Sequence, residues 1–589
     1  MSTVTAATLK MLTADVLVVG GGTGGTAAAL QAARAGADTI LVSEGPWLGG
    51  MLTAAGVSAP DGNELLSLQT GIWGAFLRSL QQQGSLSHGW VSCFTFLPAV
   101  GADIFARWAA DLPNLDWIAG QRPREVQRQG DRITGVRFED VAVEATITID
   151  ATELGDVLAL GEVPHRWGWE WPSQWQEPSA PSAPTPLTQR HPVQSPTWVV
   201  VMQDYGDATA PAIAPPPNYD AACYSGAWEG YGSGKFLDYG RLPQGRLMIN
   251  WPQRGNDYSI DLHRLVGNQA ARQQCLQEMR WHSQGFAHFI QARLGRRYGL
   301  AKDSFPPVAG ALGGGAYALR PYYRESRRLQ GRVTVREQDI LPQVNTAAAA
   351  LPLDDRGVPE GVALGNYPND HHYAGDTFTL VDKTMRWGGR TVGTPFSIPY
   401  RALVPQTTGG LLVAEKNISV SHIANGTTRL QPTVLGIGQA AGMAAALCCQ
   451  QGCEPRDLPV RSLQDALLND PTAPLAVVPL LNTTPQDPQW RQQQQAVLDA
   501  PETYAARLKL PPAATLPPAT GSMVLSGQLR QDGPAYRLVT AESQRFTLIT
   551  LNPWVNARLQ ELADGASITV DGENNAAGDW FVVETLRSL

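Results

Sequence analysis

The clearest hydrophobic pattern of the chain lies close to its start. Asp15 to Val19 is a short run of β-branched and apolar residues, the pattern of a buried parallel strand. Thr26 to Gly36 is rich in alanine and other good helix formers, and Thr39 to Val42 is again β-branched and apolar. This order predicts a strand, a helix and a second strand, all within about the 30 residues that such a unit requires.

Further along, the pattern predicts two regions that differ in composition and in their secondary structure. A first group of strands is expected at 115–118, 125–129, 133–139 and 142–150, with Gly130-Asp131 as a hairpin turn. Glu64 to Gln83 has the spacing of an amphipathic helix. The block from about 160 to 325 is rich in Gly, Tyr and Trp, with a strand at 198–203 and a long helix at 262–298.

After residue 331 the chain returns to regular patterns. Arg332–Arg336 and Leu411–Ala414 are strand-like, and Val434–Leu447 is an Ala/Gly-rich helix. After a segment rich in Pro, Gln, Ala and Leu, five short strands are predicted with a helix between the third and the fourth, which indicates an OB-type barrel. The strands are expected at 523–529, 535–539, 545–550, 567–570 and 580–585, and the helix at 553–562.

Together these patterns predict an α/β protein. We expect a Rossmann-type nucleotide-binding domain with an inserted α+β substrate domain and a C-terminal OB-like β-barrel module. The expected bounds are 1–160 for the first part of the nucleotide-binding domain, 161–325 for the substrate or cap domain, 326–455 for the return segment, 456–522 for a helical linker and 523–589 for the barrel.

Glycines at the first turn add chemistry to this pattern. Gly20, Gly22 and Gly25 match G-x-G-x-x-G, and Glu44 ends the second strand 24 residues after Gly20. The first glycine allows the tight turn, the second lets the backbone approach a pyrophosphate, and the third lets the helix pack on the sheet. Glu44 is placed to bond a ribose diol and to repel the extra phosphate of NADP. A glycine-rich turn in an ordinary α/β protein is the alternative, and the ordered context favours a dinucleotide site.

Composition narrows the class of partner. The net charge of −8 without a run of Lys or Arg argues against nucleic acid, and no apolar stretch is expected to reach the length of a membrane span. Six cysteines in 589 residues do not form a disulfide framework, and Cys448, Cys449 and Cys453 lack the paired spacing of a zinc site. We expect no metal and, because the leader lacks a signal-peptide core, a cytoplasmic protein.

Five motifs in a fixed order resemble a known family. They are GGGTGGTAAALQAARAG with SEGPWLGGML, IDATELGD, RESRRLQGRVTVREQDI, YPNDHH, and IPYRALVP followed by NGTTRLQPTVLGIGQAAGMAAA. Over residues 13 to 450 the chain resembles FAD-dependent oxidoreductases of the glutathione-reductase-like superfamily, in the branch related to fumarate reductase and succinate dehydrogenase flavoproteins. It departs from its relatives at Glu415 and Lys416, where they often have Gly-Asp or Gly-Arg.

The resemblance implies FAD and a set of residues that hold it. Succinate dehydrogenase-like proteins carry a flavin-bonding His after the glycine pair, and Met51 stands there, so the FAD is expected to be non-covalent. The start of the helix at Thr433 is the candidate to stabilise negative charge on the flavin. The expected cofactor-binding residues are Gly20, Gly22, Thr23, Gly24, Gly25, Thr26, Glu44, Gly45, Leu48, Gly49, Gly50, Met51, Val126, Ala151, Thr152, Asp156, Gln431, Pro432 and Thr433.

Four residues are candidates for catalysis. His371 and His372, beside Asp370, are candidate bases because imidazole titrates near neutral pH; alternatively one packs and the other is solvated. Arg324 and Arg327 are candidates to clamp a substrate carboxylate, with a structural ion-pair network as the alternative.

The sequence therefore predicts an FAD-dependent dehydrogenase or oxidase. It would take a hydride from a C–OH or C–NH carbon of a small polar molecule. Two alternatives stay open: reduction of an activated C=C bond, and a non-catalytic FAD-containing binding or scaffold protein that uses the barrel as its recruiter. A homo-oligomer is left open, and the electron acceptor is not identified by the sequence.

Overall fold

A seven-stranded sheet forms the centre of the protein. The computed structural model describes residues 9–344, 346–509 and 523–588. The strand order is β3-β2-β1-β6-β5-β4, and β17 also pairs with β6. The strands are β1 (Lys10–Val19), β2 (Thr39–Ser43), β3 (Leu115–Ala119), β4 (Glu125–Gln129), β5 (Arg132–Arg137), β6 (Val141–Asp150) and β17 (Leu411–Val413).

Strand β6 joins parts of the chain that are far apart in sequence. Its first half pairs antiparallel with β5, with Val143 opposite Val136. Its second half pairs parallel with β17, with Ile149 opposite Leu412, while β1 runs along nearly its whole length. Residues 411–413 thus complete a sheet that the first 150 residues begin.

Two helices pack together at very short range against this sheet. They are α1 (Thr23–Arg34) and α11 (Gln431–Gln451). A Cβ atom at Gly438 would lie 2.1 Å from the carbonyl oxygen of Gly24, and one at Gly442 would lie 2.2 Å from that of Ala28. Glycine is required at both positions because the backbones touch there.

Helix α11 is also long and apolar enough to cross a membrane. This differs from the expectation that no apolar stretch reaches that length. Its most apolar 18-residue stretch is 89% buried inside the protein. Because it packs against α1 and the sheet, α11 is the core helix of a folded domain rather than a span.

The block of about residues 160–325, called the middle block below, has a hydrophobic core of its own. This core lies beside a four-stranded antiparallel sheet of order β11-β8-β10-β9. The predicted helix 262–298 is interrupted: residues 262–266 form a 3₁₀ turn, and the α-helix begins only after the Asn268 cap. The elements are β8 (Val200–Asp204), α7 (Ser233–Tyr239), β9 (Arg241–Leu242), β10 (Arg246–Ile249), α8 (Gln269–Leu294) and β11 (Tyr298–Leu300).

Shorter elements cover the central sheet and its edges. The predicted strand 332–336 is absent from the described structure; Val335 makes one isolated bridge to Val420, and α9 follows directly. The remaining helices are α2 (Gly71–Gln82), α3 (Pro98–Ala110), α4 (Asp156–Leu160), α5 (Pro172–Trp175), α6 (Pro186–Arg190), α9 (Glu337–Ile340), α10 (His422–Thr428), α12 (Val460–Leu468), α13 (Trp490–Asp499) and α14 (Tyr504–Arg507). The remaining strands of this part are β7 (His165–Arg166), β12 (Arg328–Leu329), β13 (Gly361–Asn366), β14 (Thr384–Trp387), β15 (Arg390–Gly393) and β16 (Pro395–Pro399).

The C-terminal strands close into a barrel of order β18-β19-β20-β22-β21. Strands β20 and β22 are parallel and the helix lies between the third and fourth strands, which is the predicted OB-like arrangement. The elements are β18 (Met523–Asp532), β19 (Ala535–Thr540), β20 (Arg545–Ile549), α15 (Pro553–Glu561), β21 (Ser567–Asn575) and β22 (Trp580–Ser588).

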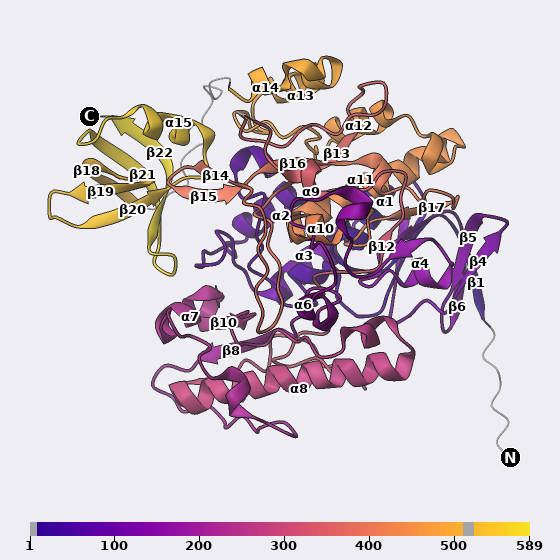
Figure 1. Cartoon of the computed structure of the whole chain (residues 1–589), viewed down its shortest axis with the longest axis horizontal. Helices are drawn as coiled ribbons and strands as arrows, with labels where there is room; N and C mark the ends of the chain where they lie inside the picture. The colour runs from indigo at the N-terminus through magenta and orange to yellow at the C-terminus, as the bar shows by residue number, and fades with distance from the viewer. Residues whose placement is uncertain (1–8, 345, 510–522, 589) are drawn as a thin grey trace.

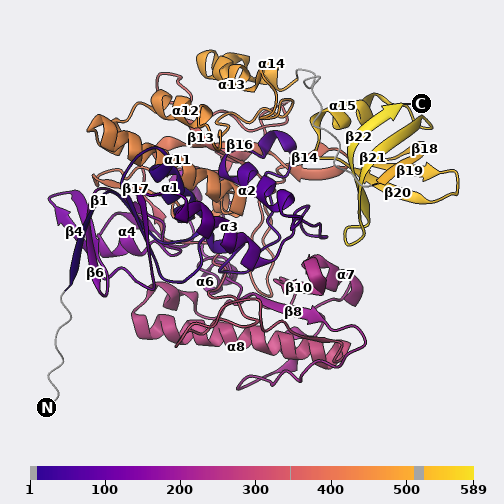
Figure 2. The same ribbon diagram turned by 180° about the vertical axis from the view of Figure 1, so that it is seen from behind.

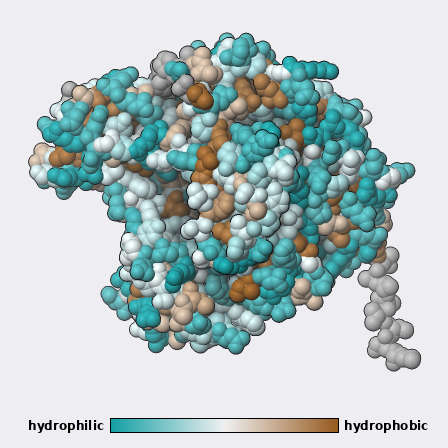
Figure 3. Space-filling model, in the orientation of Figure 1, coloured by the Kyte–Doolittle hydropathy of each residue, from teal (hydrophilic) through white to brown (hydrophobic). Residues whose placement is uncertain are grey.

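Figures 1 and 2 show the arrangement of these parts. The barrel projects from one side of the molecule beside the β14–β15 hairpin, and α8 runs along the edge of the middle block. Hydrophilic residues cover most of the face in Figure 3, and the surface is hollowed between the barrel and the middle block, which still meet at the Lys235–Asp579 ion pair of 2.8 Å. The α/β fold with an OB-like barrel is confirmed, whereas the bounds of the domains stay a prediction.

Candidate active site

The turn after β1 is built for close packing. Gly20 has φ +113°, and a Cβ atom there would lie 2.2 Å from the carbonyl oxygen of Ala151. A Cβ atom at Gly25 would lie 1.9 Å from the carbonyl oxygen of Gly20. The chain therefore needs glycine to leave β1 and to seat α1 on the sheet.

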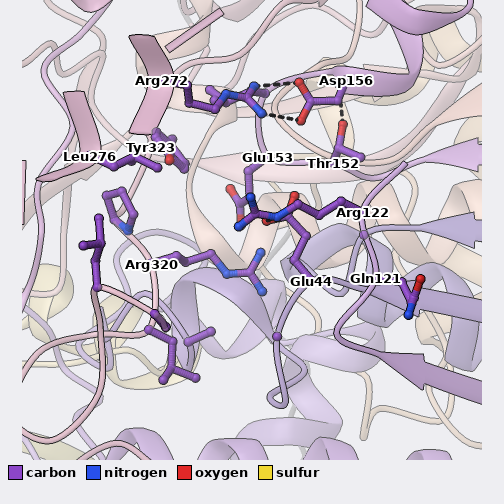
Figure 4. Close-up of a pocket in the computed structure, with 18 of the residues that line it drawn as sticks. Glu44, Gln121, Arg122, Thr152, Glu153, Asp156, Arg272, Leu276, Arg320 and Tyr323 are labelled. Atoms are coloured by element: carbon purple, nitrogen blue, oxygen red, sulfur yellow. Dashed lines mark hydrogen bonds and ion pairs between the residues drawn. The ribbon is translucent and has the colours of Figure 1, made fainter. Parts of the chain in front are cut away.

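A large cleft opens at the carboxyl ends of strands β1, β2 and β6 (Figure 4). Its empty volume is about 1340 Å³, including the part open to solvent. Of the predicted cofactor-binding residues, Gly20, Glu44, Gly45, Thr152 and Asp156 line it. Other polar residues of its lining were not predicted from the sequence: Gln121, Arg122, Glu153, Arg272 and Arg320.

Charged side chains organise the rim of this cleft. Arg122 lies 3.3 Å from the Glu44 carboxylate, and Arg272 forms a two-pronged ion pair with Asp156 at 2.7 and 3.0 Å. Burial raises the pKa of Asp156, but Arg272 and Arg327 together hold it below its usual value. One guanidinium nitrogen of Arg320 is buried without a partner among the described residues. An anionic ligand would give it one.

Arg327 is held in this region and not in a catalytic position. Its guanidinium donates to Asp156 at 3.1 Å and to the carbonyl oxygens of Leu154 and Val266. It lines neither of the two pockets described here. The structural alternative for this arginine, an internal ion-pair network, is the arrangement that the structure shows.

Two threonines of α1 fix the glycine-pair segment. The Thr23 hydroxyl donates to the Gly49 carbonyl and accepts the Met51 N–H, both at 3.0 Å, and the Thr26 oxygen accepts the Gly49 N–H at 2.8 Å. Leu48, Gly50 and these residues are buried, so they hold the segment on the start of α1 and do not line the cleft.

The remaining predicted cofactor-binding residues are of two kinds: some pack against the protein, and others have polar atoms without a partner among the described residues. Ala151 packs on Gly20 and Gly25, and Val126 packs on Gly161, away from the cleft. At the start of α11, before and after Pro432, the Gln431 side-chain oxygen and the Thr433 hydroxyl are buried without partners among the described residues. Such atoms require a ligand or water, which fits a flavin ring placed there.

A second, smaller pocket lies beside this helix start and is strongly polar. Its empty volume is about 390 Å³. It contains the predicted residues Arg324, His372 and Gln431. The full lining is Val57, Ala59, Asp61, Val91, Tyr239, Met248, Asn250, Tyr322, Arg324, Tyr367, Asp370, His372, Arg429 and Gln431.

His372 is clamped between two carboxylates. Its two ring nitrogens lie 2.9 Å from Asp257 and 2.9 Å from Asp370. Burial and Arg324 oppose its charged form, but the two carboxylates raise the pKa of His372 above its usual value. Because an imidazolium donates with both nitrogens, no lone pair is free to accept a proton from a substrate. The geometry therefore does not favour His372 as the base.

His371 faces a buried hydrogen-bond chain. One nitrogen lies 3.0 Å from the Ile423 carbonyl and the other 2.7 Å from the Tyr373 hydroxyl, which lies 2.7 Å from His422; His422 reaches Glu325 at 2.9 Å. Burial, with nearby His422, lowers the pKa of His371 well below its usual value. It is absent from the lining of both pockets, so the structure gives it a structural position.

The sequence patterns miss Asp61. Ala59-Pro60-Asp61-Gly62-Asn63 has the composition of an ordinary turn, and nothing in it marks a site. In the structure the Asp61 carboxyl lines the second pocket and forms no hydrogen bond or ion pair with the described residues. Burial, with Glu64 and Asp370 nearby, raises the pKa of Asp61 to about 8. A carboxyl group with this pKa exchanges protons near neutral pH.

No group of three or more His, Cys, Asp or Glu that could hold a metal ion occurs within residues 9–344, 346–509 and 523–588. The glycine turn, the acidic strand end and the unpartnered polar atoms at Arg320, Gln431 and Thr433 fit an extended dinucleotide instead. The site is thus built for an organic cofactor.

Comparisons with known proteins agree with this geometry. A family model described as FAD dependent oxidoreductase matches residues 15–467. No curated protein matches the chain.

Solved structures match only weakly. Thioredoxin reductase of T. acidophilum is 19% identical over 26% of this chain and 37% of that chain, with a TM-score of 0.17. A geranylgeranyl bacteriochlorophyll reductase-like protein from Thermoplasma acidophilum is 11% identical over 85% of each chain, with a TM-score of 0.29. p-Nitrophenol 4-monooxygenase from Pseudomonas putida is 11% identical over 33% of this chain and 49% of that chain, with a TM-score of 0.21. At TM-scores this low, these structures support no assignment of the fold or the function of the chain.

The family model covers most of the chain, and its match includes the glycine turn, the acidic strand end and the α11 helix. The predicted resemblance is therefore confirmed: the chain belongs to the family of FAD-dependent oxidoreductases, and it is an enzyme whose cofactor is FAD.

Proposed function

We propose that the protein oxidises a C–OH or C–NH carbon of a small anionic substrate bound in the second pocket, with Asp61 as the proton acceptor. When bound, FAD supplies the hydride acceptor. The observation that carries the proposal is the unpaired Asp61 carboxyl, with a pKa of about 8, in a pocket lined by Arg324, His372 and Arg429.

The charges around this pocket favour an anion. Arg324 and Arg429 are cationic, Arg324 and nearby cations lower the pKa of Asp257 and Asp370, and the two carboxylates raise the pKa of His372. While His372 is protonated and Asp61 is neutral, these groups carry one positive charge in excess. The Arg429 Nε atom is also buried without a partner among the described residues, which leaves a donor for a substrate carboxylate.

Asp61 and its neighbours then have separate roles. A substrate hydroxyl or amine that loses a hydride must also lose a proton, and Asp61 accepts it when ionised. His372, fixed by Asp257 and Asp370, keeps a positive charge in the pocket without taking part in proton transfer. Arg429, held by the Tyr322 hydroxyl at 2.6 Å, is placed to orient the anion.

The test is the pH dependence of turnover with panels of 2-hydroxy acids and amino acids. We expect kcat/KM of the wild type to rise with pH and to level off near pH 8, because the carboxylate form of Asp61 is the base. Asp61→Asn should lose about 100-fold or more in kcat/KM while keeping bound FAD. Retained turnover in that variant would refute the role of Asp61.

A second candidate is the reduction of an activated C=C bond, with protonated Asp61 as the proton donor. The raised pKa of Asp61 favours it, because a carboxyl that is neutral at pH 7 can deliver a proton. Here kcat/KM should fall as the pH rises through about 8. The same titration, with unsaturated acids and reduced enzyme, therefore distinguishes the two directions by the sign of the slope.

A cytoplasmic location completes the proposal. It is supported by the six cysteines, all of which are free thiols in the structure. The expected observation is enzyme that purifies from a reducing compartment without intramolecular disulfides.

A further inference from the structure

A carboxylate of the chain itself lies on the start of α1. The N–H of Gly24 donates to a Glu415 carboxylate oxygen at 2.7 Å. A Cβ atom at Gly22 would lie 2.4 Å from the same oxygen, so the glycine turn and this carboxylate are in direct contact. Residues at the start of this helix are the ones whose N–H groups bind the pyrophosphate in a G-x-G-x-x-G unit.

The position of Glu415 follows from the fold. Strand β17 ends at Val413, and a Cβ atom at Gly24 would lie 1.5 Å from the carbonyl oxygen of Ala414. The two residues after Ala414 therefore arrive at the N-terminus of α1. A glycine in place of Glu415 would leave that space open, whereas the glutamate side chain fills it.

Lys416 and Glu153 complete a buried charge cluster. The Lys416 ammonium lies 2.9 Å from Glu415 and 2.7 Å from Glu153, and both Glu415 and Lys416 are fully buried. The second carboxylate oxygen of Glu153 is buried without a partner among the described residues, although Glu153 also lines the large cleft. Two carboxylates thus share one lysine beside the helix start, and one acceptor is left unmatched.

We propose that Glu415 is a built-in competitor of the FAD pyrophosphate. Its carboxylate satisfies the N-terminus of α1 in the FAD-free protein, and FAD binding displaces it from the Gly24 N–H. Lys416, which already lies 2.9 Å from the other oxygen of Glu415, keeps hold of the displaced carboxylate. FAD consequently binds more weakly than it would to the same cleft without this side chain. The proposal concerns FAD loading, and it is independent of the substrate and of Asp61.

Charge and space both set the pyrophosphate against Glu415. A pyrophosphate and the Glu415 carboxylate are both anions that need the same N–H groups, so they cannot occupy the helix start at once. Removing the carboxylate frees the Gly24 N–H, and it also leaves Lys416 with Glu153 alone. Both changes strengthen the attraction of the cleft for phosphate.

The experiment measures the FAD dissociation constant of the full-length apoprotein by quenching of flavin fluorescence. Glu415→Ala should bind FAD at least about tenfold more tightly than the wild type, because a charge-assisted hydrogen bond no longer has to be broken. Glu415→Gln keeps the shape of the side chain, so its FAD affinity should increase less. ADP carries the same pyrophosphate, so each variant should bind ADP more tightly than the wild type by the same ratio as it does FAD.

Glu170→Gln is the matched control. The Glu170 carboxylate is also buried, accepts the His422 N–H at the start of α10 at 2.7 Å and pairs with Arg328 at 2.8 Å, but it lines neither pocket. Its removal should leave the FAD dissociation constant unchanged. Thermal unfolding of each apoprotein verifies that the variants are folded.

The outcomes separate this proposal from the cofactor assignment. Unchanged FAD affinity in folded Glu415→Ala and Glu415→Gln would overturn it, as would an equal gain in Glu170→Gln. If neither the wild type nor any variant bound FAD, the cofactor assignment would fall along with the proposal. A gain confined to the Glu415 variants would support both.

Discussion

Asp61 couples the stability of the apoprotein to pH. The pKa of this carboxyl is about 8 in the folded protein, whereas it is about 3.9 in an unfolded chain. Between these values the folded state binds the proton more tightly, so stability falls as the pH rises from about 4 to about 8. Asp61→Asn lacks this titration. We expect its melting temperature to exceed that of the wild type by a margin that grows across this window. A constant margin from pH 5 to pH 9 would show that Asp61 is not the titrating group.

His372 changes the stability in the same direction as Asp61, because its pKa is also raised in the folded protein. Its stabilising contribution is complete below about pH 6.5 and is lost as the pH rises through the folded value. His372→Gln should destabilise the protein by about 3 kcal/mol at pH 6, because Asp257 and Asp370 lose the cation between them. The cost should shrink at higher pH. Denaturant unfolding at pH 6 and pH 9 measures both values.

At the scale of elements, the β14–β15 hairpin holds the barrel. Its turn residue Gly388 has φ +53°, and a Cβ atom there would lie 2.3 Å from the carbonyl oxygen of Thr550. The Thr550 N–H donates to the Gly388 carbonyl at 2.9 Å, and the Gly388 N–H donates to Asn556 at 2.8 Å. Gly388→Val should therefore separate the hairpin from the barrel and increase hydrogen exchange at the Thr550 amide by about tenfold or more.

Gly533 offers a control for that experiment. It also has a positive φ, +56°, but among the described residues, its two chain neighbours aside, none has an atom within 4 Å of a Cβ placed there. Gly533→Val carries the backbone strain without the clash at the hairpin. Its Thr550 amide should keep wild-type protection. Equal exchange in both variants would mean that strain, and not the contact with the hairpin, controls this amide.

Helices and strands with a clear hydrophobic periodicity were predicted best from the sequence. All five barrel strands and α15 overlap the ranges that alternation and turn residues predict, and so do α1 and β2, whereas β1 begins at Lys10, five residues before the predicted strand. The strand expected at 332–336 failed because its residues bond two different segments. The Val335 N–H donates to Ser419 and the Val335 carbonyl accepts the Ser421 N–H, whereas the N–H groups of residues 332 and 333 donate to residues 404 and 401. The nucleotide-binding turn was predictable from the sequence, because its glycines lie within one short strand–turn–helix segment. Asp61 was not, because its raised pKa arises from Glu64 and Asp370, whose proximity is a product of the whole fold.

At the scale of the whole molecule, the cofactor site needs both ends of the family region. Helix α11 supplies the Gln431 and Thr433 atoms that have no partner among the described residues, and β17 completes the sheet, while β1, β2 and β6 supply the glycine turn and Glu44. A fragment of residues 1–330 should therefore fail to bind FAD in equilibrium dialysis even if it is soluble. Full affinity in that fragment would show that the return segment is dispensable.

The sharing of β6 between β1 and β17 has a consequence for synthesis on the ribosome. Strand β6 leaves the ribosome long before β17, since the whole middle block lies between them. At about 5–20 residues per second this interval lasts tens of seconds, during which the second half of β6 has an unpaired edge. FAD cannot act as a template for this early sheet, because α11 has not yet been made. The newborn chain is consequently most exposed to aggregation in that interval, and chaperone binding should be strongest then.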